Sequence, residues 1–147
     1  MNKNSLYKFL NGKWRISKTI SNGMIMDGIL HMVSVSDAEL EYSEVLTTYD
    51  LNGKKLIDGN SHFLFNIVSD TKLKIFKSNN SLYQTHKFVF SRTSIFQAKS
   101  DLSTHLCGDD RYQSQMTIDS YDSFLWEHQI YGPRKDYSMK AIYKRLS

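Results

Sequence analysis

The 147-residue sequence predicts an all-β fold, a single antiparallel up-and-down barrel of about eight to ten strands with a short helical turn at its N-terminus. Aromatic residues make up 13% of the chain, and they lie with Val, Ile and Thr in short runs that alternate with polar residues, as in strands. Polar turn sequences separate these runs. The chain has one proline, and no linker, charge block or repeat divides it, so we expect one domain over residues 1–147.

The first expected element is a helical turn, because Asn4 or Ser5 can cap it and Leu6, Phe9 and Leu10 then share one face. Such a turn would plug one end of the barrel. The strands that we expect after it span residues 14–20, 25–35, 40–49, 62–68, 72–76, 82–90, 95–102, 112–119, 124–130 and 137–145.

Turn sequences support this division into strands. Asn52-Gly53 between two strand runs is a strong hairpin signal, and Ser21-Asn22-Gly23 is another. The alternation is clearest in the last third of the chain, where one face of a strand is wet and the other carries Phe124, Trp126, His128 and Ile130. Gly132-Pro133 turns the chain into the final strand, which brings Arg134 and Lys135 to the mouth of the barrel.

Charge and cysteine content restrict the classes of function. The net charge is +4, but the nineteen Lys and Arg residues are scattered among fifteen acidic residues, which argues against a nucleic-acid surface. We see no apolar leader at the N-terminus and no segment apolar enough to span a bilayer. The lone Cys107 allows no internal disulfide. We therefore expect a cytoplasmic protein.

The N-terminal motif Gly12-Lys13-Trp14 precedes the first expected strand. It resembles the Gly-x-Trp signature of lipocalin-like (calycin) proteins, in which the tryptophan closes the barrel base and an arginine of the last strand packs across it. The resemblance implies that Gly12 and Trp14 are structural residues and that Arg145 is the packing partner of Trp14.

A second resemblance rests on His105-Leu106-Cys107-Gly108-Asp109-Asp110-Arg111-Tyr112 and Gly132-Pro133-Arg134-Lys135-Asp136-Tyr137, with Tyr42-Ser43-Glu44 and His86 upstream. These residues resemble the motifs of a bacterial family, domain of unknown function 6314 (DUF6314). The resemblance runs from Phe9 to Arg145. It implies a calycin-like barrel and brings no established activity.

The strand alternation and the second resemblance together select the candidate ligand-binding residues, which are Tyr42, Glu44, His86, His105, Cys107, Asp110, Tyr112, Arg134 and Tyr137. Each has a structural alternative. Glu44 is either an inward carboxylate with a raised pKa, suited to acid–base chemistry, or a partner of Arg134 or a lysine at the rim. Arg134 is either an anion anchor or a turn residue held by local ion pairs.

His105, Cys107, Asp110 and Tyr112 offer N, S and O donors, but they lack the second ligand cluster of a structural zinc site, and we expect a hydrogen-bonded polar cluster rather than a metal. Taken alone, Cys107 is either a nucleophile assisted by His105 or His86, or an inert packed residue. The sequence names no cofactor and leaves the oligomeric state open.

Three functions follow from these candidates. The leading one is a barrel that binds a small apolar or anionic molecule in its lumen. The second is an enzyme with Glu44 or His105 as acid or base and Arg134 as anion anchor, suited to decarboxylation, isomerisation or hydration. The third is a solidly packed barrel that acts through an exposed face.

Overall fold

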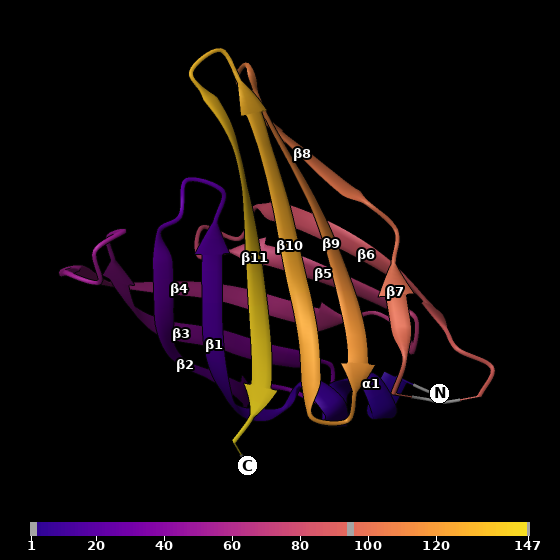
Figure 1. Cartoon of the computed structure of the whole chain (residues 1–147). Coiled ribbons are helices and arrows are strands. Elements are labelled where there is room, and N and C mark those ends of the chain that lie inside the picture. The colour runs from indigo at the N-terminus through magenta and orange to yellow at the C-terminus, as the bar shows by residue number, and fades with distance from the viewer. Residues whose placement is uncertain (1–2, 94–95, 147) are drawn as a thin grey trace.

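The computed structural model describes residues 3–93 and 96–146, and it confirms the predicted closed antiparallel barrel with one short N-terminal helix (Figure 1). Helix α1 spans Lys3–Leu10. The strands are β1 (Gly12–Ile20), β2 (Ile25–Ser34), β3 (Glu39–Tyr49), β4 (Lys55–Ile67), β5 (Lys72–Lys77), β6 (Leu82–Phe90), β7 (Ala98–Ser100), β8 (Ser103–Cys107), β9 (Asp110–Ser120), β10 (Ser123–Gly132) and β11 (Lys135–Arg145).

The strands pair antiparallel in the order β10-β11-β1-β2-β3-β4-β5-β6-β7-β9, and β9 also pairs with β10, which closes the ring. Strand β8 lies outside this ring, because it pairs with β9 alone. The pairing of β9 with β10 closes the ring and removes the edge that β10 would expose in an open sheet, while β8 stays paired on one side only.

Two of the expected strands differ from the sequence prediction, and one strand, β8, was not predicted. The expected strand 95–102 is reduced to the short β7, and its first residue, Ile95, lies outside the described residues. The chain leaves the ladder after β7 because side chains bridge β6 and the segment that follows: Asp101 Oδ1 accepts from the N–H of Lys87 at 2.9 Å. Strand β8 then begins as a separate element, which brings the described strands to eleven.

Strand β4 starts at Lys55 and not at residue 62, because the hairpin at Asn52-Gly53 pairs Tyr49 directly with Lys55. The residues from Lys55 to Asn60 are exposed on both faces. A strand that is wet on both sides shows no apolar–polar alternation, and so the sequence pattern missed its first half.

The lower end of the barrel is closed by α1 and by the last strand. Trp14 is fully buried, and its indole N–H donates to the carbonyl of Leu10 at 3.0 Å. The Arg145 guanidinium lies 4.2 Å from the centre of the Trp14 ring and donates to the carbonyl of Phe9 at 2.7 Å. This is the packing that the lipocalin-like resemblance implies, and it seals this end with aromatic rings.

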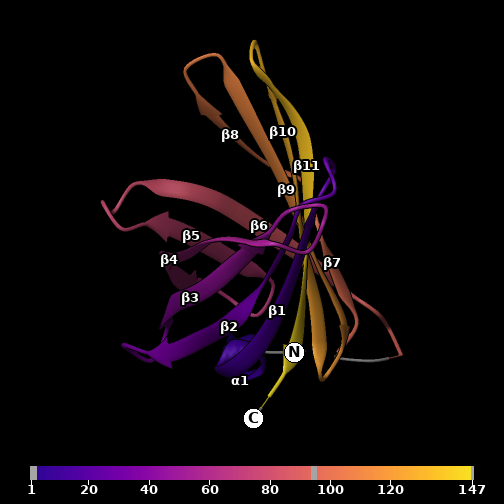
Figure 2. The same ribbon diagram turned by 60° about the vertical axis from the view of Figure 1, so that its left-hand side comes forward.

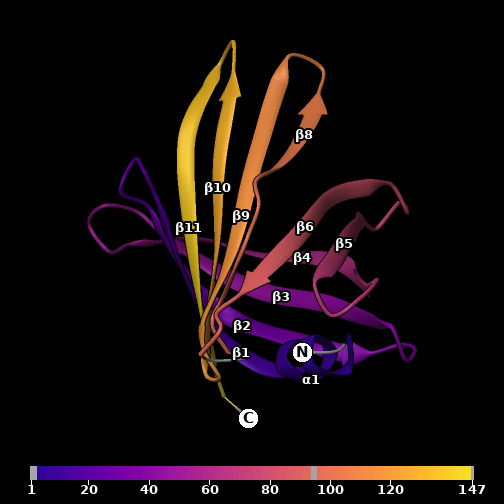
Figure 3. The ribbon, with the colours of Figure 1, turned by 90° about the vertical axis from the view of Figure 1, so that its right-hand side faces the viewer.

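The upper end is open in shape. Figure 2 and Figure 3 show that the β8–β9 and β10–β11 hairpins rise beyond the other strands and lean away from β4, β5 and β6, while α1 lies across the opposite end. No described helix is long and apolar enough to cross a membrane.

Candidate ligand-binding site

A cavity of about 180 Å³ lies inside the barrel. An engineered apolar cavity of about 150 Å³ holds benzene, so this volume suits a molecule with one aromatic ring. Phe63 and Tyr83 stack on one wall with their centroids 5.5 Å apart. The lining residues are Lys18, Glu44, Ser61, Phe63, Tyr83, Tyr112, Trp126, His128, Ile130, Tyr137, Met139, Ala141 and Tyr143.

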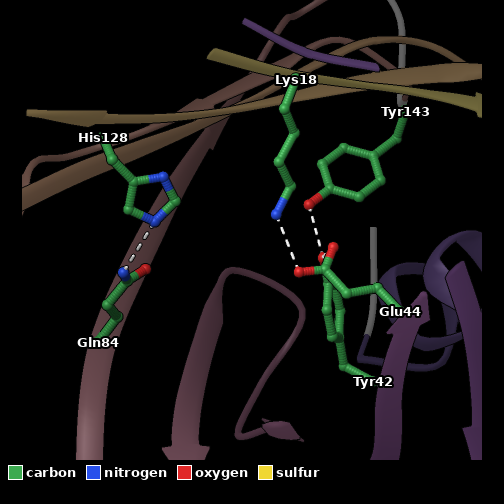
Figure 4. Close-up of polar contacts among 6 residues, drawn as sticks. All are labelled: Lys18, Tyr42, Glu44, Gln84, His128 and Tyr143. Atoms are coloured by element: carbon green, nitrogen blue, oxygen red, sulfur yellow. Dashed lines mark hydrogen bonds and ion pairs between the residues drawn. The ribbon is translucent and has the colours of Figure 1, made fainter. Parts of the chain in front are cut away.

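A buried ion pair lies at the wall of this cavity. Glu44 is only 2% exposed, and its Oε1 lies 2.8 Å from the Nζ of Lys18, whose side chain is 11% exposed (Figure 4). Lys18 comes from β1 and Glu44 from β3, with β2 between the two strands, and the two side chains meet in the barrel interior. A carboxylate at this depth needs a partner, and Lys18 supplies the opposite charge.

Two tyrosines extend this pair into a hydrogen-bonded chain. Tyr42 Oη lies 2.7 Å from Glu44 Oε2 and 2.7 Å from Tyr143 Oη. The carboxylate only accepts, so the Tyr42 proton goes to Glu44, and Tyr143 must donate to Tyr42. Burial, followed by the neighbouring phenol and the Glu44 charge, raises the pKa of Tyr42 well above its usual value, and burial and Glu44 do the same for Tyr143. Both phenols therefore stay protonated.

A second polar group fills the opposite side of the interior and is centred on Gln84. Its Oε1 accepts from Trp126 Nε1 at 3.1 Å and lies 2.8 Å from His86 Nε2, while its Nε2 lies 3.3 Å from His128 Nε2 (Figure 4). An indole nitrogen only donates, so the amide oxygen must face Trp126. It follows that His86 donates through Nε2 and that His128 accepts at Nε2 and carries its proton on Nδ1.

Both histidines are held in the neutral form. Burial lowers the pKa of His86 to about 4. Burial, the Lys18 ammonium and His86 together lower the pKa of His128 to about 3. The Nδ1 atom of His128 is buried and has no hydrogen-bond partner in the part of the chain that the structure describes. At neutral pH the charged groups that line the cavity are therefore Lys18 and Glu44.

The two family motifs meet at the mouth of the barrel. Lys135 Nζ donates to Tyr112 Oη at 3.0 Å and lies 3.2 Å from Asp110 Oδ2. These two contacts raise the pKa of Lys135. Gly132 lies directly against Asp110, and any Cβ at this position would overlap the carboxylate. Since Tyr112 also lines the cavity, this arrangement fixes one aromatic wall of the entrance.

The structure brings only some of the sequence-predicted residues together. Glu44, Tyr112 and Tyr137 line the cavity, and Tyr42 and His86 lie behind it in the two polar groups. His105 lies beside this set, with its ring centroid 5.2 Å from that of Tyr83, and burial followed by the charge of Lys77 lowers its pKa.

The remaining candidates lie on the outside. Cys107 is exposed at the end of β8, and Arg134 is exposed in the turn between β10 and β11. Neither lines the cavity. The partner of Glu44 is Lys18 inside the lumen, and not Arg134 or a lysine at the rim. In residues 3–93 and 96–146 no group of three His, Cys, Asp or Glu side chains is placed to hold a metal ion.

Sequence reasoning did not select Lys18, Gln84 or His128 as site residues. The strand alternation carried a signal for Lys18 and for His128. Lys18 follows Trp14 and Ile16 on the same inward face, and His128 follows Trp126 on its own strand in the same way. A lone polar residue on an otherwise apolar face is the pattern that would have found both.

The fold recurs in solved structures of very different sequence. The S-type phycobiliprotein lyase CPES from Guillardia theta is 8% identical, with a TM-score of 0.62 over 100% of this chain and 94% of that one. The structure of EF1p2_mFAP2b bound to DFHBI is 14% identical, with a TM-score of 0.53 over 98% of each chain. No curated protein matches this chain. The family of unknown function DUF6314 matches residues 10–145, and the chain belongs to this family.

Proposed function

We propose that this barrel binds one small, flat organic molecule in its lumen. The observation that carries the proposal is the cavity of about 180 Å³, which has aromatic walls and a small number of polar groups. Ligand sites in proteins have this composition, because apolar walls provide affinity and a few polar atoms fix the orientation. EF1p2_mFAP2b holds DFHBI, so a barrel of this fold has room for a small molecule.

The other two functions receive less support. The proposed acid–base site needs Glu44 or His105 together with Arg134 around one substrate, but of these three residues only Glu44 lines the cavity. Both carboxylate oxygens of Glu44 are also engaged, one by Lys18 and the other by Tyr42. A solidly packed barrel would have no cavity larger than a water molecule, and this cavity is several times that size.

Toluene is a suitable probe, because it tests the cavity without depending on any polar contact. We expect it to shift the NMR signal of the Trp126 indole N–H, which lies at the lumen, and to leave that of Trp14, which lies at the sealed base. The Ala141→Leu variant places extra volume into the cavity and should weaken toluene binding by about tenfold or more.

Ala38→Leu is the matched control, since Ala38 lies outside the lining residues. It should bind toluene as the parent protein does, and thermal unfolding checks that both variants fold. If toluene at saturating concentration moves neither indole signal, or if Ala141→Leu binds it as well as the parent protein, the lumen is not a binding site and the proposal is wrong.

A further inference from the structure

The lumen has an unusual combination of charge and hydrogen-bonding capacity. Its one ammonium, Lys18, lies 2.8 Å from the carboxylate of Glu44, so the charges of the lining residues cancel. Yet Glu44 is the one hydrogen-bond partner of Lys18 in the described part of the chain, and the other N–H bonds of the ammonium remain for a ligand. The lumen therefore provides donors without a net charge.

We infer that the ligand is a neutral ring compound with a hydrogen-bond acceptor, such as an aromatic amide or ketone, whose carbonyl oxygen accepts from Lys18 Nζ. This inference rests on the proposed function and specifies its ligand class. A carboxylate would bring an unbalanced negative charge into the cavity, because Lys18 is already neutralised. Burying an ion without a counter-charge costs several kcal/mol, which a single hydrogen bond does not offset.

The sequence suggested an apolar or anionic ligand, with Arg134 as the anion anchor. Arg134 lies in the exposed turn after β10 and does not line the cavity. The nearest cation at the mouth, Lys135, is paired with Asp110. Lys77 lies against the Tyr83 ring, 5.1 Å from its centroid, outside the lining residues and in partial contact with solvent. No unpaired positive charge therefore lines the cavity itself.

The other polar atoms of the lining point to the same class of ligand. Tyr112 accepts a hydrogen bond from Lys135, which leaves its own hydroxyl proton available to donate. The acceptor nitrogen of His128 is used by Gln84. Donors therefore remain on Lys18 and Tyr112, while Glu44 and the acceptor nitrogen of His128 are engaged, and an acceptor on the ligand complements these donors.

Benzamide, benzoate and benzamidine test this inference, because they share one shape and differ in charge. Titrations of the parent protein followed by the Trp126 indole N–H signal should show that benzamide binds at least about tenfold more tightly than benzoate or benzamidine. Lys18→Met removes the donor and should weaken benzamide binding by about fivefold.

Glu44→Gln gives the sharpest comparison. It keeps the shape of the side chain and leaves Lys18 unpaired, so the lumen gains one positive charge. We expect benzoate to become the preferred ligand, with a change of about tenfold or more in the benzoate-to-benzamide affinity ratio. Glu127→Gln makes the same change of net charge on the exposed face of β10 and should leave the order of the three ligands unaltered.

Toluene titrations of each variant separate the possible failures. If toluene does not bind the parent protein, the proposed function is wrong and this inference falls with it. If toluene binds but benzoate binds the parent protein as tightly as benzamide does, or Glu44→Gln leaves the order unchanged, the inference alone is overturned.

Discussion

Acid should destabilise this barrel well above the pH at which ordinary carboxylates titrate, because two histidines are held neutral inside it. The pKa of His86 is lowered from 6.5 to about 4 and that of His128 from 6.5 to about 3. In the unfolded chain both regain values near 6.5. The unfolded state therefore binds more protons below pH 6.5, and the free energy of unfolding falls as the pH decreases.

The size of the effect follows from the two shifts. Between about pH 7 and about pH 4.5, each histidine lowers the free energy of unfolding by about 2.5 kcal/mol, so the pair accounts for about 5 kcal/mol. Single domains have a total stability of about 5–15 kcal/mol, and the loss is a large part of that. The decline should begin near pH 6.5 and level off once the pH falls through the folded-state values of about 4 and about 3.

Urea unfolding followed by tryptophan fluorescence across this pH range measures the effect. In His86→Gln we expect the decline to be roughly halved, since one of the two titrating groups is gone. Asn60→Gln, a polar replacement on an exposed position of β4, should keep the full decline. The reasoning is refuted if the parent protein loses less than about 1 kcal/mol over the range, or if His86→Gln declines as steeply as the parent protein.

Two further changes test the hydrogen-bonded chain and the mouth of the barrel. Tyr42→Phe leaves both Glu44 Oε2 and the Tyr143 hydroxyl without their partner, whereas Tyr143→Phe removes only a terminal donor. Urea unfolding should therefore show a loss of stability of about 2–4 kcal/mol for Tyr42→Phe and of about 1 kcal/mol for Tyr143→Phe. Equal losses would contradict the assigned proton direction. Gly132→Ala forces Asp110 to move and should lower the free energy of unfolding by about 1–3 kcal/mol. The control Gly59→Ala, at a site with open space around it, should change the free energy of unfolding by less than about 0.5 kcal/mol.

Much of the fold was predictable because it depends on local patterns. Period-two alternation located most strands, and Asn52-Gly53 located a hairpin that the structure contains. The errors fall where the pattern carries no signal. The first half of β4 is wet on both faces, and the break between β7 and β8 depends on Asp101 and other side chains that bridge to β6.

The candidate site was predictable only in part. Tyr42 and Glu44 were both selected as candidates from the sequence, and the structure joins them by a hydrogen bond. Their essential partners, Lys18 and Tyr143, come from strands at opposite ends of the chain. Which strands meet across a closed barrel depends on its closure and register, and no local pattern of residues reports them.

The sequence by itself determined the class of fold, the strand boundaries where one face is buried, and the inward or outward side of most residues, because alternation on a strand is a local property. The tertiary structure decided which inward residues meet. It paired Lys18 with Glu44, made the lumen neutral, and left Arg134 and Cys107 at the surface. The cytoplasmic location stays a prediction. Charge compensation depends on distances across the lumen, and closure of the barrel sets those distances.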